Sequence, residues 1–168
     1  MRSHTVIDSA VGPLTLVAEE GSIVGLYMDL QRHRPDDAEL GEPDCGGRDA
    51  EPFRAAAVQL DAYFSGALTL FTLPLAPRGS QFQQRVWAAL QDIPYGETES
   101  YGALAERIGS PGAARAVGLA NGKNPVSIVI PCHRVVGSNG NLTGYGGGLE
   151  RKKQLLHLEL AVSSAALF

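Results

Sequence analysis

The residues best suited to chemistry lie side by side at Pro131, Cys132, His133 and Arg134. A free cysteine thiol has a pKa of about 8.5, and its thiolate is the form that acts as a nucleophile. A neighbouring base or positive charge raises the thiolate fraction. His133 and Arg134 are therefore candidates for activating Cys132, and the segment predicts a cysteine nucleophile beside a histidine base.

Three other interpretations of the Cys-His pair have to be weighed. A buried cysteine that behaves as a small hydrophobic residue fits the pair equally well. A cysteine hydrolase would also use the pair, but it needs an oxyanion hole that nothing else in the sequence indicates. A metal site needs about four ligands at recognisable spacing. The remaining candidate ligands are scattered singly, at Cys45, His4, His33 and His157, so we expect no metal.

The thiol needs an element that holds it in place. The β-branched run at residues 128–130 predicts a short buried strand. Pro131 ends this strand because proline lacks an N–H and has a fixed φ. The thiol is therefore expected where a strand stops.

Helices are expected on both sides of this segment. Residues 101–108 and 113–122 predict two short helices with a glycine-containing turn between them, and Ser100 can cap the first. This arrangement matches the helix-turn-helix pattern. Small residues on the second helix favour close approach, either to another helix or to a DNA groove. A final helix is expected over residues 149–159, and four leucines should face the core: Leu149, Leu155, Leu156 and Leu160.

The first 75 residues predict a small α+β unit. Three strands of an antiparallel meander are expected at residues 5–8, 14–19 and 23–30, with a returning strand at 69–75. Residues 31–49 are charged and aperiodic, which predicts a long, partly disordered loop. A helix is expected over residues 52–64, with apolar positions at Phe53, Ala56, Ala57, Leu60 and Phe64. Residues 74–79 read as a linker, and a helix capped by Ser80 should bury Trp87.

The flanks of Cys132 carry a family resemblance. The run AARAVGLANGKNP precedes it at residues 113–125, PCHRV surrounds it at 131–135, and GYGGGL follows at 144–149. Together they resemble the bacterial type of O6-alkylguanine-DNA alkyltransferase, the methylated-DNA–protein-cysteine methyltransferases. The resemblance implies a ribonuclease-H-like domain with an antiparallel sheet and a helix at residues 1–75. It also implies a mainly α-helical domain with a winged helix-turn-helix at residues 80–168.

The function that this resemblance implies is DNA repair in a single turnover. O6-alkylguanine is flipped out of the duplex, and its alkyl group passes irreversibly to Cys132. O4-alkylthymine is an expected minor substrate, and neither a cofactor nor a metal is required. The alternative is a non-catalytic protein that only binds alkyl lesions, which stays open if the thiol is buried or its pKa is raised.

The resemblance also assigns roles to individual residues. His133 acts as base through a water, and Glu159 orients it. Tyr101 assists the leaving guanine, Asn124 forms a hinge before the cysteine segment, and Lys152 lies near the pocket. Four residues are expected to bind the flipped guanine. The Val135 carbonyl accepts from it, Tyr145 forms a wall of the pocket, the Gly146 N–H faces O6, and Gly147 lies beside them. Arg115 is the finger that replaces the flipped base, and the other expected DNA contacts are Tyr101, Gly102, Ser110, Ala114, Ala116, Gly118 and Ser138.

Composition is consistent with one ordinary domain or two small ones in 168 residues. The net charge is −4, but the charges are unevenly distributed. Residues 98–160 contain seven Lys/Arg and four Asp/Glu, whereas the remaining residues contain seven Lys/Arg and fourteen Asp/Glu. This asymmetry favours DNA binding by the C-terminal part. No apolar run approaches the roughly 20 residues that span a bilayer, and no signal-peptide region begins the chain. The two cysteines do not suggest a disulfide framework, so we expect a cytoplasmic protein. The family resemblance implies a monomer that binds double-stranded DNA through the minor groove, with cooperative binding left open.

Overall fold

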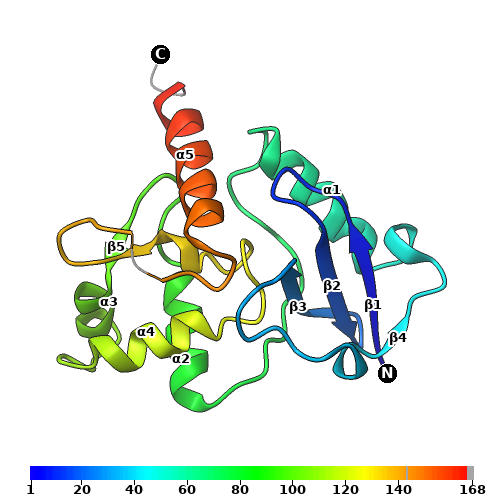
Figure 1. The fold of residues 1–168 in the computed structure, drawn as a ribbon, viewed down its shortest axis with the longest axis horizontal. Helices are drawn as coiled ribbons and strands as arrows, with labels where there is room; N and C mark the ends of the chain where they lie inside the picture. The colour runs from blue at the N-terminus through cyan, green and yellow to red at the C-terminus, as the bar shows by residue number, and fades with distance from the viewer. Residues whose placement is uncertain (143, 166–168) are drawn as a thin grey trace.

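The computed structural model describes residues 1–142 and 144–165. Its N-terminal half is a sheet of four strands backed by one helix, and its C-terminal half is mainly helical (Figure 1). Strands β1 (Arg2–Ile7), β2 (Leu14–Glu19) and β3 (Ser22–Met28) form the expected antiparallel meander. A short strand β4 (Glu42–Pro43) pairs in parallel with β1, so the sheet is mixed and has the order β3-β2-β1-β4.

Residues 31–49 are more ordered than their composition indicates. They contain the 3-10 helices η1 (Asp37–Leu40) and η2 (Gly47–Asp49) as well as β4, so the expectation of a partly disordered loop is wrong. Leu40 is buried in a small cluster with Val17, Val24 and Tyr27 on the outer face of the sheet. Burial of this apolar face fixes a segment that has no hydrophobic period of its own.

The returning strand expected at residues 69–75 is also absent. Leu75 alone forms a bridge with Ile23, and hydrogen bonds join Ile23 N to Pro74 O (2.8 Å) and Ala76 N to Ile23 O (3.0 Å). The N–H of Thr72 donates to the side chain of Gln59 instead of a strand. Pro74 cannot donate to a ladder, so the pairing remains local.

Helix α1 (Phe53–Phe64) follows the expected period, with one correction. Its buried face ends in Tyr63, whereas Phe64 is only partly buried. Tyr63 is three residues and Phe64 four residues after Leu60, and both spacings return to the same face of a helix. The helical period alone therefore does not choose between them. The buried tyrosine brings a hydroxyl into the interior, and such a group needs a hydrogen-bond partner.

The C-terminal half begins with α2 (Gln81–Leu90), which Ser80 caps in a reciprocal box with Gln83. Trp87 packs in the core as expected, and its indole N–H donates to Ala120 O (2.8 Å). That bond ties α2 to α4 (Ala114–Gly122), which follows α3 (Tyr101–Arg107). Ser100 caps α3 through its side chain, and the two helices form the expected helix-turn-helix pair.

The last helix, α5 (Leu149–Ala165), runs well past its expected end. Leu155 is buried, but Leu149 and Leu160 are 49% and 58% exposed, so their expected inward orientation is wrong. The inner face is instead formed by Lys152, Leu155 and Glu159. Polar side chains can occupy this face because each has partners in the interior, which are described below.

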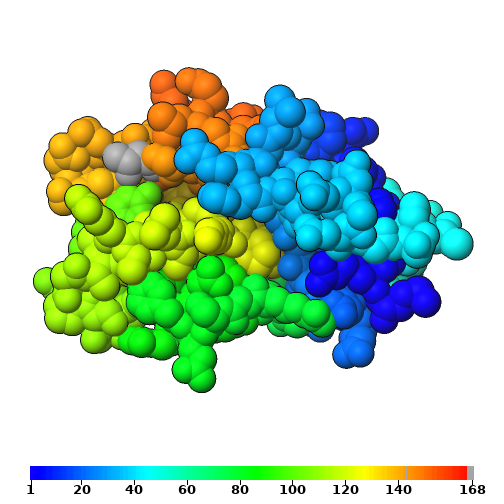
Figure 2. Space-filling model, turned by 60° about the horizontal axis from the view of Figure 1, so that its bottom comes forward, coloured from blue at the N-terminus to red at the C-terminus, as the bar shows by residue number. Residues whose placement is uncertain are grey.

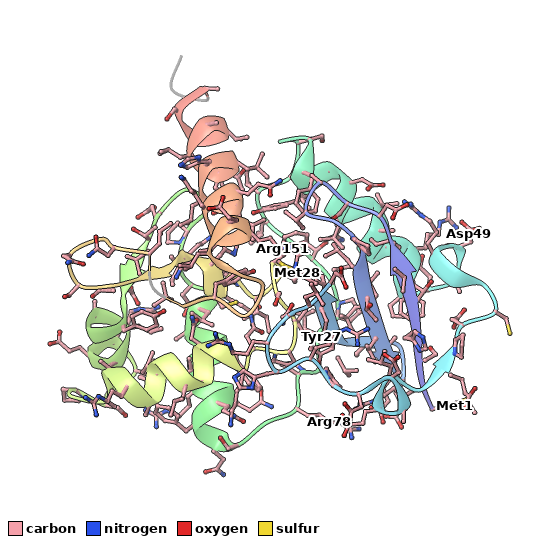
Figure 3. All side chains as sticks on the ribbon, viewed as in Figure 1. Met1, Tyr27, Met28, Asp49, Arg78 and Arg151 are labelled. Atoms are coloured by element: carbon pink, nitrogen blue, oxygen red, sulfur yellow. The ribbon has the colours of Figure 1, made fainter. Side chains whose placement is uncertain are left out.

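Strand β3 joins the two halves. Leu26 N donates to Pro125 O (2.8 Å), and Ser127 N donates to Leu26 O (3.3 Å), so this edge strand pairs with the segment before Cys132. Figure 3 shows Arg151, at the start of α5, beside Met28, at the end of β3, and the Arg151 guanidinium donates to Asp29 O. One hydrophobic core continues through both halves. Within the described residues, no helix is long and apolar enough to cross a bilayer.

Candidate active site

Cys132 does not follow a strand, which corrects the expectation for residues 128–130. These residues form a tight turn in which Ile130 N donates to Val126 O (3.0 Å) and Val129 N donates to Ser127 O (2.8 Å). Ile128 has a φ of 73°, a conformation that a β-branched residue rarely adopts. The run is apolar because the turn is buried, and burial of a turn gives the same composition as a buried strand.

Asn124 holds this turn closed. Its side-chain Nδ2 donates to Ile130 O (2.7 Å), and its side-chain Oδ1 accepts from Val126 N (3.0 Å). Both bonds are buried, so they are protected from competition with water. Asn124 therefore fixes the backbone just before Pro131 and Cys132.

Cys132 begins the 3-10 helix η3 (Cys132–Arg134) and is only 3% exposed. Burial raises the pKa of its thiol, while the Asn124 side chain and the charge of Lys152 oppose that rise. The thiol is therefore largely protonated at rest. A reaction at its sulfur needs a nearby acceptor for the proton.

His133 can be that acceptor, and the structure defines which nitrogen does it. Its Nε2 lies 2.6 Å from Glu159 Oε2, and both side chains are buried. Burial alone would raise the pKa of Glu159, but His133 and Arg134 outweigh this and hold it at about 2. The ionised carboxylate can only accept, so Nε2 carries the hydrogen and Nδ1 is the basic atom. Nδ1 is buried and has no partner among the described residues.

Burial lowers the pKa of His133, and the opposing effect of Glu159 is smaller. The imidazole is therefore neutral near pH 7 and able to take a proton. This is the ordering of nucleophile, base and carboxylate that activates a weak nucleophile in many enzymes.

The structure corrects the expected role of Arg134 and adds Tyr63, which the sequence analysis did not identify. Arg134 does not act on the thiol; its guanidinium holds Glu159 through Nε (2.8 Å) and Nη2 (3.1 Å) and donates to Ile93 O (2.7 Å). Tyr63 of α1 donates its hydroxyl to Glu159 Oε2 at 2.6 Å. The N-terminal half thus reaches the cluster, although its sequence indicated a scaffold only. The one signal in the sequence was that Tyr63 occupies a position of α1 that can face the core, where its hydroxyl needs a hydrogen-bond partner.

Lys152 is fully buried beneath the same segment. Its ammonium donates to Val135 O (2.6 Å) and Gly144 O (3.3 Å), which ties α5 to the backbone after Cys132 and to the glycine loop. Burial lowers its pKa to about 8. The Val135 carbonyl, expected to read the base, thus already accepts a bond from Lys152.

A cavity of about 130 Å³ lies between α3, α4 and the glycine loop. Three of the expected pocket residues line it: Tyr101, Tyr145 and Gly146. Gly147 lies behind the wall, where a Cβ would meet Met28 Sδ and the Tyr145 ring. The sequence reasoning missed other lining residues, namely Asn121 and, from the N-terminal half, Arg32 and His33.

Asn121 connects this cavity to the reactive segment. Its side-chain amide donates to Cys132 O (3.3 Å), a carbonyl that also accepts from Val135 N. Tyr145 also lines the cavity and is buried, which raises its pKa well above the ordinary value, and a thiolate at Cys132 would raise it further. Cys132 is not among the residues that line the cavity, and Asn121 is the lining residue whose side chain bonds its backbone.

The expected DNA contacts lie partly together. On α4, Arg115 and Ala116 are exposed and Ala114 and Gly118 are half-buried, while Val117 faces the core. Leu119 adds an apolar side chain to the same face and is 69% exposed. Figure 2 shows this face, with α4 in yellow-green beside the light-blue segment that follows β3.

The remaining expected contacts lie around this helix and after the cysteine segment. Gly102 is exposed in α3, Ser110 is half-buried in the turn before α4, and Ser138 is exposed in the turn after β6 (Val135–Val136). Strand β6 pairs in parallel with β5 (Glu99–Ser100), so the Ser138 turn is attached next to α3. No group of three or more His, Cys, Asp or Glu in the described ranges is placed to hold a metal ion.

Known proteins match the chain over both halves. The ribonuclease-like domain of 6-O-methylguanine DNA methyltransferase matches residues 3–77, and the DNA-binding domain of the same family matches residues 81–161. The methylated-DNA–protein-cysteine methyltransferase of Mycolicibacterium paratuberculosis is 53% identical over 99% of this chain and 98% of its own length. That of Methanosarcina acetivorans is 46% identical over 93% of this chain and 97% of its own.

Solved structures agree with these matches. Mycobacterium tuberculosis OGT, crystallised in complex with DNA, superposes with a TM-score of 0.88 at 52% identity, over 95% of this chain and 94% of that one. Because the matches are this extensive and this similar, the chain belongs to the 6-O-methylguanine DNA methyltransferase family, the methylated-DNA–protein-cysteine methyltransferases.

Proposed function

We propose that Cys132 is the residue that accepts the alkyl group from damaged DNA. As a member of its family, the chain repairs DNA by transferring an alkyl group to a cysteine of the protein. The observation that carries the assignment is that Cys132 is buried in the same 3-10 helix as His133, whose Nε2 is held by Glu159 and whose Nδ1 has no partner among the described residues. The other cysteine, Cys45, is exposed and lies far from this cluster in the fold.

The reaction is a displacement at the alkyl carbon. The sulfur of Cys132 forms a bond to this carbon as the bond from carbon to guanine O6 breaks, and the thiol proton passes through a water to His133 Nδ1. Glu159 stabilises the imidazolium that forms. Tyr101 supplies a proton or hydrogen bond to the ring of the leaving guanine. The product is a thioether that does not revert, so each molecule acts once and needs no cofactor.

The cavity between α3, α4 and the glycine loop is the proposed site of the flipped base. Tyr145 forms its wall, Gly146 offers a backbone N–H to O6, and Gly147 allows the close packing of that wall on Met28. Val135 O, which accepts a bond from Lys152, is the proposed acceptor for the exocyclic amine of guanine. O4-alkylthymine lacks that amine, which supports its place as a minor substrate.

DNA docks through α4 in the minor groove in this proposal. The small side chains of the helix let its backbone approach the groove, and Arg115 enters the space that the flipped nucleotide leaves. Tyr101, Gly102, Ser110 and Ser138 contact the adjacent backbone. Loss of normal pairing at an O6-alkylated guanine lowers the free energy needed to flip it.

Further assignments complete the proposal. Residues 1–75 and 80–168 form the two domains, an assignment supported by the division between sheet and helices. The protein acts as a monomer on double-stranded DNA, with cooperative binding to be measured. Both cysteines are free thiols, which is consistent with a cytoplasmic location.

The test is the intact mass of the protein after incubation with excess duplex that contains O6-methylguanine, followed by peptide mapping. We expect one added methyl group, located on Cys132, with guanine restored and no further turnover. A methyl group on another residue would refute the assignment of Cys132.

A second candidate, lesion binding without transfer, is favoured by one observation: the thiol is buried and its pKa is raised. The same experiment separates the two functions. Tight, lesion-selective binding with no change in mass would support binding alone.

A further inference from the structure

We propose that Tyr63, on α1 of the N-terminal half, is a positioning residue for alkyl transfer that acts on His133 through the shared carboxylate of Glu159. This inference rests on the proton relay proposed above. It adds to that relay a hydroxyl group from the half of the molecule that does not carry the cysteine.

The geometry places two donors on one oxygen. The Tyr63 hydroxyl and His133 Nε2 each lie 2.6 Å from Glu159 Oε2, and the tyrosine and carboxylate are 0% and 1% exposed. Because the carboxylate is ionised, the hydroxyl must be the donor. A distance of 2.6 Å is typical of a hydrogen bond from O–H to a charged oxygen, which is roughly twice as strong as a neutral one.

The other groups around Glu159 come from three further segments. Arg134 of η3 donates through Nε to Oε1 (2.8 Å) and through Nη2 to Oε2 (3.1 Å), and Gly96 N lies 3.4 Å from Oε1. Tyr95 packs edge-on against Tyr63, and Arg134 stacks over its ring. Lys152 of α5 adds a positive charge that acts on His133.

This crowding gives Tyr63 a definite electrostatic effect. Each hydrogen bond to a carboxylate withdraws charge from it, so the Tyr63 bond weakens the attraction between Glu159 and a protonated His133. Without that bond the imidazolium is better stabilised, and the pKa of His133 rises. The hydroxyl thus helps to keep His133 neutral, which is the form that accepts the thiol proton.

The test measures single-turnover methyl transfer from duplex O6-methylguanine, at saturating protein, from about pH 5 to 9. In Tyr63→Phe we expect the midpoint of the acidic limb to move to higher pH, by about half a pH unit or more. The matched control is Tyr95→Phe, because the Tyr95 hydroxyl is buried without a hydrogen-bond partner among the described residues. Its midpoint should equal that of the unaltered protein.

A second variant keeps the test decisive if Tyr63→Phe does not fold. Replacement of Tyr63 by 3-fluorotyrosine keeps the shape of the ring but makes the hydroxyl a stronger donor. The midpoint should then move to lower pH, opposite to the effect of phenylalanine. Unchanged midpoints in both variants, or shifts in the same direction, would overturn the proposal and leave Tyr63 as a packing residue.

A failure of the relay itself would look different. His133→Asn should lose transfer at every pH while it retains lesion binding. If His133→Asn transferred methyl groups at the unaltered rate, the relay would be wrong. Loss of transfer in His133→Asn without a shift in either Tyr63 variant would refute only the role of Tyr63.

Discussion

Cys132 combines two opposed properties. Burial raises the pKa of its thiol, which protects it from oxidants and other electrophiles. In the proposed reaction the same burial makes transfer depend on a base that takes the proton as the new bond forms. His133, the proposed base, lies next in sequence, and Glu159 fixes its tautomer so that Nδ1 is the basic atom.

The first prediction separates binding from chemistry. Cys132→Ala should bind duplex O6-methylguanine with nearly unchanged affinity but remove no methyl group, because the cavity does not depend on the sulfur. Gel-shift titration and chromatographic analysis of the recovered bases measure the two properties. The control is Cys45→Ser, which should repair normally. Methyl removal by Cys132→Ala would contradict direct transfer.

The second prediction concerns pH and stability. The pKa of Glu159 is lowered from 4.5 to about 2, so its stabilising effect is present above pH 4.5 and is lost as the pH falls towards 2. The pKa of His133 is lowered from 6.5, so stability already begins to decline below pH 6.5. Glu159→Gln should cost about 3–5 kcal/mol at pH 7, because Arg134 is left as a buried unpaired charge.

Urea denaturation between pH 7 and 3 measures this effect. The free-energy difference between the unaltered protein and Glu159→Gln should shrink as the pH falls below 4.5. The control is Glu150→Gln, which removes an exposed carboxylate from the first turn of α5. A difference that stays constant with pH would show that folding does not lower the pKa of Glu159.

At the scale of elements, α4 serves two surfaces at once. Val117 and Ala120 pack in the core, while Arg115 and Leu119 stand in solvent. Several positive charges of the C-terminal part do not reach the surface, since Arg134 and Lys152 are buried. The sequence-level charge asymmetry therefore overstates the exposed positive field, and Arg115 becomes the more important charge on this face.

The third prediction tests Arg115 as the finger. Arg115→Ala should slow repair in duplex DNA at least tenfold, because the flipped state loses a few kcal/mol of support. Repair of the same lesion in single-stranded DNA should change much less. The control is Arg54→Ala, which removes an exposed arginine from α1. Equal slowing on both kinds of DNA would assign Arg115 to phosphate binding.

The fourth prediction tests the turn before the cysteine. Asn124→Ala removes two buried hydrogen bonds, worth about 2 kcal/mol together, and relaxes the turn that positions Cys132. Urea denaturation and the single-turnover rate should both decline. The control is Asn139→Ala, because Asn139 accepts one backbone bond in an exposed turn. Equal losses in the two variants would mean that burial of the turn is unimportant.

At the scale of the molecule, the two halves act as one body around the site. β3 pairs with the turn before Cys132, Arg32 N donates to Gly146 O (2.7 Å), and Tyr63 bonds Glu159. The N-terminal half therefore supports the segment around Cys132, the glycine loop and Glu159 at three separate points, through β3, Arg32 and α1. This arrangement explains how a half without nucleophile or DNA helix contributes to the site.

The fifth prediction follows from the shared core. Unfolding in urea should be a single transition, because neither half can lose its packing without exposing the other. Trp87 is the only tryptophan and reports on the C-terminal half through its fluorescence. Hydrogen exchange of β2, measured by mass spectrometry at the same urea concentrations, reports on the sheet. Opening of β2 at lower urea than the Trp87 transition would contradict a shared core.

Local signals in the sequence identified much of this protein. Period and capping residues predicted the meander, α1, α2 and the helix pair, because these features depend on neighbours within a few residues. The motif around Cys132 identified the family, since it records the chemistry of the site directly. The strand expected at residues 128–130 was wrong because burial, which the sequence does indicate, is compatible with either a turn or a strand.

Tertiary structure decided the contacts between residues distant in sequence. Nothing local shows that Tyr63 would meet Glu159, that Arg134 would turn from the thiol to this carboxylate, or that Lys152 would replace leucines on the inner face of α5. A buried charge is tolerated only where its partners converge, and convergence depends on how whole elements pack. The sequence by itself therefore determined the family and the helices around Cys132, and it predicted Cys132 as the nucleophile and His133 as its base. The packing of the two halves determined the electrostatic environment in which that base works.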